Sequence, residues 1–224
     1  MEKNVVVFRQ DEVFENYLHD LLLPLGAVIS TEKNGKNTEM TVDCGDEKTV
    51  DAVARALCSV KKFSVLTRFF PKAPDDVLGA AFMGALVGKE YETEVSEVRK
   101  RIRRTACINA DGVLNFLLAD RLRQWREMGT IASALHAQCL EEEDVKALVK
   151  YFMSGDALSK RTVVLDKGLY YDDDNSDIPL PRLYATDTEN EVFTLLMLRP
   201  AGVIIPFPKG RSEKLIALIR FLGE

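Results

Sequence analysis

The chain has few histidines, no closely paired cysteines and no long apolar run, and each shortage excludes a class of protein. The two histidines among 224 residues, His19 and His136, have no second histidine or cysteine at metal-ligand spacing, so no local zinc motif exists. The four cysteines are scattered without a CxxC pair, which is typical of reduced thiols rather than of a disulfide scaffold. The longest near-apolar stretch, residues 77–87, is shorter than a membrane span of about 20 residues.

The amino-acid composition is that of an average globular protein. Apolar residues make up 46% of the chain and charged residues 29%, which excludes collagen-like and disordered proteins. The formal net charge of −5 argues against a protein that coats nucleic acid with its whole surface. The apolar run at residues 5–8 ends at Arg9 and lacks the longer core of a secretory signal. We therefore expect a cytoplasmic protein.

Residues 1–70 predict a small α/β segment. The β-branched residues 4–9 predict a strand, and apolar residues at helical spacing over 11–23 predict an amphipathic helix. The Asn-Gly dipeptide that starts at Asn34 tolerates positive φ at both central positions of a primed turn, so it predicts a β-hairpin. A second helix over 50–60 completes the order β-α-β-β-α, which suits an antiparallel sheet with helices on one face.

Residues 75–155 predict a helical region without a convincing strand, after a boundary marked by prolines. The run 77–87 is apolar nearly all round, which is typical of a buried helix. Gly84 in this run and Gly88 directly after it lie one helical turn apart and would allow another helix to approach closely. Further helices are expected at intervals up to residue 155, among them the highly charged 90–104.

Residues 160–224 predict a second small α/β segment, so the fold class is α+β. A hairpin is expected over 162–171, followed by a helix whose start has capping-box spacing between Thr186 and Glu189. The continuous apolar run 201–207 predicts a buried strand, and a closing helix follows it.

Two local patterns come close to reactive or metal-binding sites but lack their defining residues. Cys44 precedes a predicted helix, where the helix dipole activates a thiol, but Asp43 and Asp46 flank it with opposing negative charge. The acidic loop 172–177 has the alternating oxygens of a calcium loop, but Asp177 stands at the position that requires glycine. We favour a structural cysteine and a solvated loop, and we predict no catalytic residue, metal site or cofactor.

The turn after the last predicted strand is a candidate anion site. Lys209, Gly210, Arg211 and Ser212 lie between a strand and a helix, where α/β folds hold anions on backbone N–H groups. Neither the phosphate-loop motif nor the dinucleotide-binding glycine motif is present. An anion site and an ordinary turn with Ser212 as the helix N-cap therefore both stay open.

Positive charge is concentrated in residues 99–126, here called the basic segment. It has eight basic and two acidic residues, so its charge is +6 against −11 for the rest of the chain. Such a segment can meet DNA, an anionic membrane surface or an acidic partner, or it can pair internally, as the i,i+4 spacing of Glu97 and Arg101 indicates. No stacking aromatics lie between these basic residues and no helix-turn-helix turn is present, which disfavours nucleic-acid binding. The basic residues are Arg99, Lys100, Arg101, Arg103, Arg104, Arg121, Arg123 and Arg126.

The C-terminal third carries a family resemblance. Its densest part is residues 191–205, EVFTLLMLRPAGVII, with further similarity in the helix end 147–152, the hairpin 163–171 and the apolar residues 215–219. Over 147–222 the chain thus resembles the YtxC-like family of sporulation proteins from endospore-forming bacteria. The resemblance implies a cytoplasmic protein of the mother cell or the forespore, associated with spore formation and without an established molecular activity. It implies no active-site residues.

Three functions remain open from the sequence. The first is a non-enzymatic interaction or structural role with a protein partner, or with further copies of the chain. The second is anion or nucleotide binding, or an enzyme, at residues 209–212. The third is nucleic-acid binding through the basic segment. We favour the first because no catalytic constellation emerges and the charge is segregated into blocks that suit an oppositely charged partner.

Overall fold

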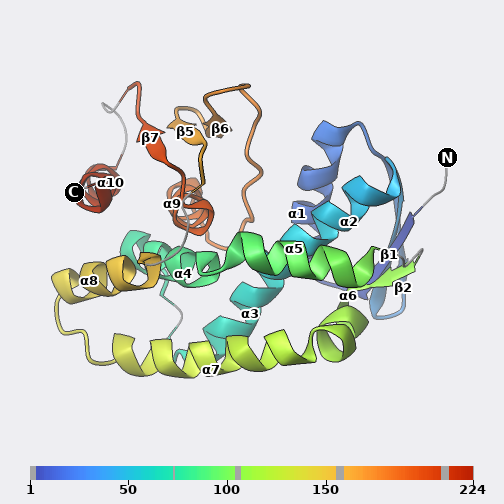
Figure 1. Ribbon diagram of the computed structural model, residues 1–224, viewed down its shortest axis with the longest axis horizontal. Coiled ribbons are helices and arrows are strands. Elements are labelled where there is room, and N and C mark those ends of the chain that lie inside the picture. Colours follow the sequence, from blue (N-terminus) through green and yellow to red (C-terminus); the bar gives the residue numbers. More distant parts are fainter. Residues whose placement is uncertain (1–3, 73, 104–106, 155–158, 208–211, 224) are drawn as a thin grey trace. The chain divides into compact units, whose positions relative to one another are not determined.

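Figure 1 shows the computed structural model, in which the chain folds into two compact units with helices and strands in each. The α+β fold class is therefore confirmed. Unit 1 contains residues 1–66 and 91–129, and unit 2 contains residues 67–90 and 130–224. This division differs from the three consecutive segments expected, because each unit takes part of the helical middle. The structure describes residues 4–72, 74–103, 107–154, 159–207 and 212–223.

Unit 1 is built on a four-stranded sheet in the order β2-β3-β1-β4. β3 is antiparallel to both β2 and β1, whereas β4 is parallel to β1. Along β1 and β3 every second side chain is buried, among them Val6, Phe8, Met40 and Val42. This alternation means that one face of the sheet is covered and the other is open. The strands are β1 (Asn4–Arg9), β2 (Val28–Asn34), β3 (Asn37–Asp43) and β4 (Cys107–Asn109).

The predicted β-hairpin is confirmed, but its turn lies one residue later than expected. Asn34 pairs with Asn37, so the two central residues are Gly35 and Lys36. Gly35 has a φ of 62°, which a glycine adopts without strain. The Gln10 side chain donates to the carbonyl of Gly35 at 2.9 Å, and its backbone N–H donates to that of Lys36 at 3.0 Å. These contacts hold the turn one position beyond the one that the dipeptide rule favours.

Helices complete unit 1 and pack on the covered face of the sheet. The Phe8 ring of β1 meets the Phe14 ring of α1 edge-on, with centroids 5.1 Å apart, and α1 lies beside α2 (Figure 1). The expectation of helices on one face is met. The helices are α1 (Glu12–Leu22), α2 (Asp46–Ala56), a π-helical stretch (Leu57–Lys61), α3 (Lys62–Leu66), α5 (Tyr91–Ile102), α6 (Ala110–Gly112) and the first part of α7 (Ala119–His136).

The prediction that residues 75–155 contain no strand is wrong. β4 lies inside that region and pairs with β1 over three residues. Only Ile108 of β4 is buried, so the sequence shows no alternation there that would distinguish a strand.

Unit 2 is organised around α4 (Val77–Gly88), which is buried nearly all round, as expected. α4 packs against α9 (Asp187–Leu198) and α8 (Glu142–Met153). The glycines of α4 make the first contact possible: a Cβ added at Gly88 would lie 2.7 Å from the carbonyl oxygen of Met197. The close approach predicted from Gly84 and Gly88 is thus confirmed. Across the described ranges, no helix has the length and apolar character needed to cross a bilayer.

A three-stranded sheet in the order β6-β5-β7 completes unit 2, with α10 (Glu213–Gly223) as the closing helix. The hairpin of β5 (Thr162–Leu165) and β6 (Leu169–Tyr171) is confirmed. The strand expected over 201–207 is confirmed, but its burial is wrong: β7 covers only Gly202–Ile204, and Ile204 is 42% exposed. Among the described residues β7 pairs with β5 alone and forms an edge of the sheet, and an apolar run does not reveal that edge position.

Candidate functional site

Two arginines of the basic segment pair internally with carboxylates of unit 1. Arg101 holds Asp120 with two hydrogen bonds, from Nη1 to Oδ1 at 2.7 Å and from Nη2 to Oδ2 at 2.9 Å. This bidentate contact holds the pKa of the Asp120 carboxyl well below its usual range. Arg121 donates from Nε to Oε2 of Glu97 at 2.9 Å. Internal pairing is therefore real, but the partner of Arg101 is Asp120 rather than the Glu97 suggested by helical spacing.

Three other cations of the basic segment line a groove in unit 1. Arg99 and Lys100 lie on the same side of α5 as Ser96, because spacings of three and four residues fall on one side of a helix, and Arg103 follows directly after the helix end. Glu47 and Val50 of α2 form the opposite wall. The groove has a volume of about 250 Å³ and opens to solvent. We call these six residues the α5 groove.

The α5 groove has an excess of positive charge. Nη2 of Arg103 lies 2.8 Å from Oε1 of Glu47, in a pair whose two side chains are 68% and 75% exposed. Nη1 of Arg99 lies 3.3 Å from Oδ1 of Asp51, but that carboxylate also accepts a hydrogen bond from Arg55 at 2.9 Å. Within the described part of the chain, Lys100 has no ion-pair partner. One carboxylate thus faces three cations in the groove, and exposed pairs of this kind contribute only about 0–1 kcal/mol, so they open readily.

Two further members of the basic segment lie on α7. Arg123 is exposed on α7 and lies 4.0 Å from Glu127, and Arg126 lies on the same helix. Arg104 falls outside the described residues.

The predicted anion turn can be placed only at its end. Lys209, Gly210 and Arg211 lie outside the described residues. The Ser212 carbonyl accepts a hydrogen bond from the backbone N–H of Ile216 at 3.1 Å, so Ser212 stands immediately before α10. This position agrees with its expected place at the start of the helix.

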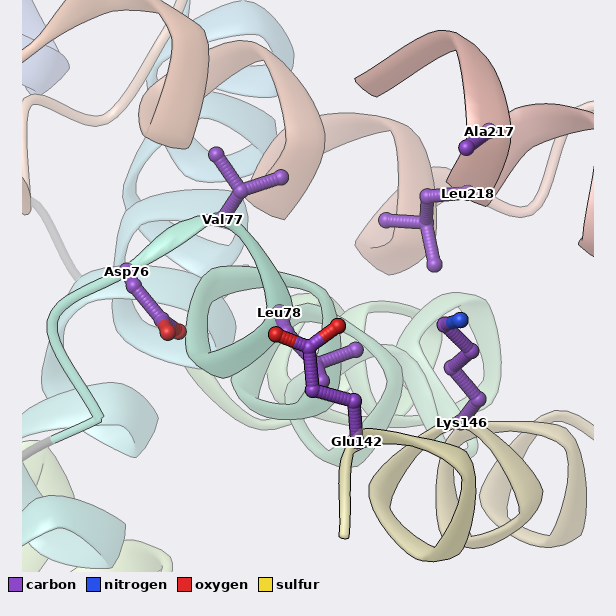
Figure 2. Close-up of a pocket in the computed structure, with 7 residues that line it drawn as sticks. All are labelled: Asp76, Val77, Leu78, Glu142, Lys146, Ala217 and Leu218. Atoms are coloured by element: carbon purple, nitrogen blue, oxygen red, sulfur yellow. The ribbon is translucent and has the colours of Figure 1, made fainter. Parts of the chain in front are cut away.

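A small pocket of about 100 Å³ in unit 2 is a site that the sequence did not suggest (Figure 2). Figure 2 shows the Glu142 carboxylate next to Leu78, with Lys146 on the next turn of α8. Two of its polar groups already have structural partners: Oδ1 of Asp76 accepts from the N–H of Gly79 at 2.7 Å, and Lys146 lies 2.5 Å from Glu143. The pocket was missed because its lining comes from three helices far apart in sequence. The other lining residues are Val77, Ala217 and Leu218.

The residues weighed as metal or nucleophilic sites have structural surroundings. The His136 ring packs against the rings of Phe70 and Phe82, with centroids 5.8 and 5.0 Å away, and its burial lowers its pKa below 6.5. Sγ of Cys44 lies 3.4 Å from Oγ1 of Thr49 in the first turn of α2. In the portion of the chain that the structure describes, no three histidine, cysteine, aspartate or glutamate side chains gather to hold a metal ion.

The acidic loop is held by an arginine. The guanidinium of Arg161 binds Asp173 from Nε at 3.0 Å and lies 2.7 Å from Oδ2 of Asp174. Asp174 also accepts hydrogen bonds from the backbone and hydroxyl of Ser176, and these contacts lower its pKa. The favoured interpretation of this loop, a solvated turn, agrees with the arrangement.

Comparisons with protein-family models, with curated proteins and with solved structures each gave no significant match. The α5 groove therefore carries the functional argument on its own geometry.

Proposed function

We propose that this chain is a cytoplasmic sporulation protein that acts by binding an acidic protein partner in the α5 groove, without catalysing a reaction. The resemblance of residues 147–222 to the YtxC-like family supports the link to spore formation. The observation that carries the binding role is the row of Arg99, Lys100 and Arg103 along one wall, opposed by a single carboxylate of the other wall, Glu47.

The arrangement of the cations favours binding of an acidic polypeptide over a role that is limited to stabilising α5 itself. Arg99 and Lys100 on α5 and Arg103 just after its end are one and three residues apart in sequence, so they match carboxylates that repeat along a partner helix or extended chain. Arginine forks bind carboxylates bidentately, whereas Lys100 supplies a mobile point charge. Cations at the end of α5 also stabilise that helix through its dipole, so a test must separate binding from stability.

A charge-reversal experiment separates the two roles. Lys100→Glu removes the groove cation that has no ion-pair partner among the described residues, and Arg123→Glu makes the same change of charge on α7, outside the groove. In an endospore-forming host whose own copy is deleted, we expect wild type and Arg123→Glu to restore heat-resistant spores and Lys100→Glu to fail at equal protein level. If both variants restore heat-resistant spores equally, the α5 groove is not needed for the function and the proposal is wrong.

A cross-linking experiment identifies the partner. A photoreactive amino acid at Ser96, inside the groove, should capture a protein through an Asp- or Glu-rich segment during sporulation, and the same group at Arg123 should not. If retardation at low salt instead shows DNA binding that Lys100→Glu weakens, the partner is nucleic acid and the proposal is wrong.

A further inference from the structure

We propose that two copies of this chain pair through β2, antiparallel to each other, and join their four-stranded sheets into one continuous sheet. β2 is an edge strand of unit 1, with β3 as its strand neighbour. It is seven residues long, and all of its side chains except Ile29 are exposed; Val28 is 72% exposed. The opposite edge strand, β4, has only three residues. A long exposed edge is a template for pairing with another strand.

The hairpin turn determines which backbone groups of β2 face outward. Asn34 and Asn37 close a two-residue turn, so they form a hydrogen-bonded pair. Hydrogen-bonded and non-hydrogen-bonded pairs alternate along an antiparallel ladder. The N–H and C=O groups of Ile29, Thr31 and Lys33 therefore point away from β3, toward the open edge.

Twofold symmetry then selects one register. For outward-facing groups to meet each other, the axis must pass beside one residue of β2, either an outward-facing one or Ser30 or Glu32 between two of them. An axis at Lys33 or at Glu32 would place two like charges opposite each other. An axis at Ile29 or at Ser30 would leave the Lys33 end of the strand without a partner. An axis at Thr31 aligns β2 along its whole length, and three residue pairs then exchange two hydrogen bonds each.

The side chains suit the Thr31 register. On one face, Thr31 lies opposite its own copy, a favourable cross-strand pair, and Ile29 lies opposite Lys33, whose aliphatic stem covers it. On the other face, Ser30 lies opposite Glu32, and Val28 lies opposite Asn34. Each charged residue thus faces an uncharged one, and no like charges are directly opposed. Because β2 is complementary to itself along its full length, its partner is a second copy of this chain rather than a strand of another protein.

Two lysine substitutions on adjacent residues test the register. Sedimentation equilibrium of the full chain should detect a monomer–dimer equilibrium. Thr31→Lys opposes two lysines and should lower the association constant about fivefold. The matched variant Ser30→Lys places the same charge opposite Glu32 and should leave the dimer equal or stronger. A wild-type chain that stays monomeric at its highest soluble concentration overturns the proposal, as does equal weakening by both variants.

A disulfide experiment tests the same register independently. In the Thr31 register the two Thr31 Cα atoms lie about 5.5 Å apart, within the range of a disulfide, so Thr31→Cys should give a covalent dimer on oxidation. The two Lys33 Cα atoms lie about 14 Å apart along the strands, so Lys33→Cys should not exceed the background of the native cysteines. A dimer that cross-links through neither position, or through Lys33→Cys, places the interface elsewhere and contradicts the proposal.

Discussion

Nζ of Lys62 lies 2.7 Å from Oε2 of Glu94, and both side chains are buried, with 0% and 2% exposed. Oε1 of the same Glu94 accepts a hydrogen bond from the Trp125 indole at 2.8 Å. The three residues come from α3, α5 and α7, so this ionic cluster links three helices inside unit 1. Charges survive such burial only when paired and hydrogen-bonded.

Removing one partner of this cluster should destabilise unit 1 strongly. Lys62→Met leaves the Glu94 carboxylate buried without its cation, and we expect a loss of about 3–5 kcal/mol in the free energy of unfolding. Urea unfolding followed by Trp125 fluorescence measures it. The double variant Lys62→Met/Glu94→Gln should recover much of the loss because no charge remains buried. Arg123→Met, which breaks an exposed pair, should change stability by less than about 0.5 kcal/mol.

A methyl group on α4 should be costly where that helix meets α9. In Gly88→Ala the new Cβ would lie 2.7–2.8 Å from backbone atoms of Leu196 and Met197, so the helices must separate. We expect a loss of about 1–3 kcal/mol of unfolding free energy, despite the better helix propensity of alanine. Gly168→Ala, in the turn between β5 and β6, is the control for an added methyl group, because no atom beyond its chain neighbours lies within 4 Å of the added Cβ. Thermal unfolding that is unchanged in Gly88→Ala would contradict the close packing of α4 and α9.

Stability should fall on mild acidification through His136. Burial lowers the pKa of this histidine below 6.5 in the folded chain, and the charge of Asp76 opposes the shift in part. The unfolded chain therefore takes up the proton first, so this contribution is complete above pH 6.5 and is lost as the pH falls below it. Urea midpoints measured from about pH 8 to about pH 5 test this, and His136→Gln should flatten the slope. An unchanged slope would exclude His136 as its origin.

The cysteines should differ sharply in reactivity. Cys58 is fully buried, and burial raises the pKa of its thiol, whereas Cys107 is exposed on β4. A thiol reagent should therefore modify Cys107 in the native protein and reach Cys58 only after unfolding. Mass spectrometry of time points gives the order, with Cys107→Ser as the control. Native labelling of Cys58 at the rate of Cys107 would show that its surroundings open readily.

The sequence determined the local elements that a run of similar residues or a turn dipeptide marks. The β-branched residues of β1 and the apolar run of α4 are visible in the chain itself, because each extends over several consecutive residues. The hairpin was predicted from its Asn-Gly dipeptide, and the close contact of α4 from its glycines. The three-residue β4 and the exposure of β7 were not predicted, because they depend on pairing with β1 and β5, distant strands that local patterns do not report.

Only the tertiary structure decided which charges face each other. In the sequence the basic segment is one block, but the fold turns Arg101 and Arg121 toward Asp120 and Glu97 and leaves Lys100 in the α5 groove. In the same way, Arg199 is buried and donates to the carbonyls of Ala85 and Phe152, at the ends of two other helices. Coulomb attraction depends on separation in space, which chain packing sets and residue order does not.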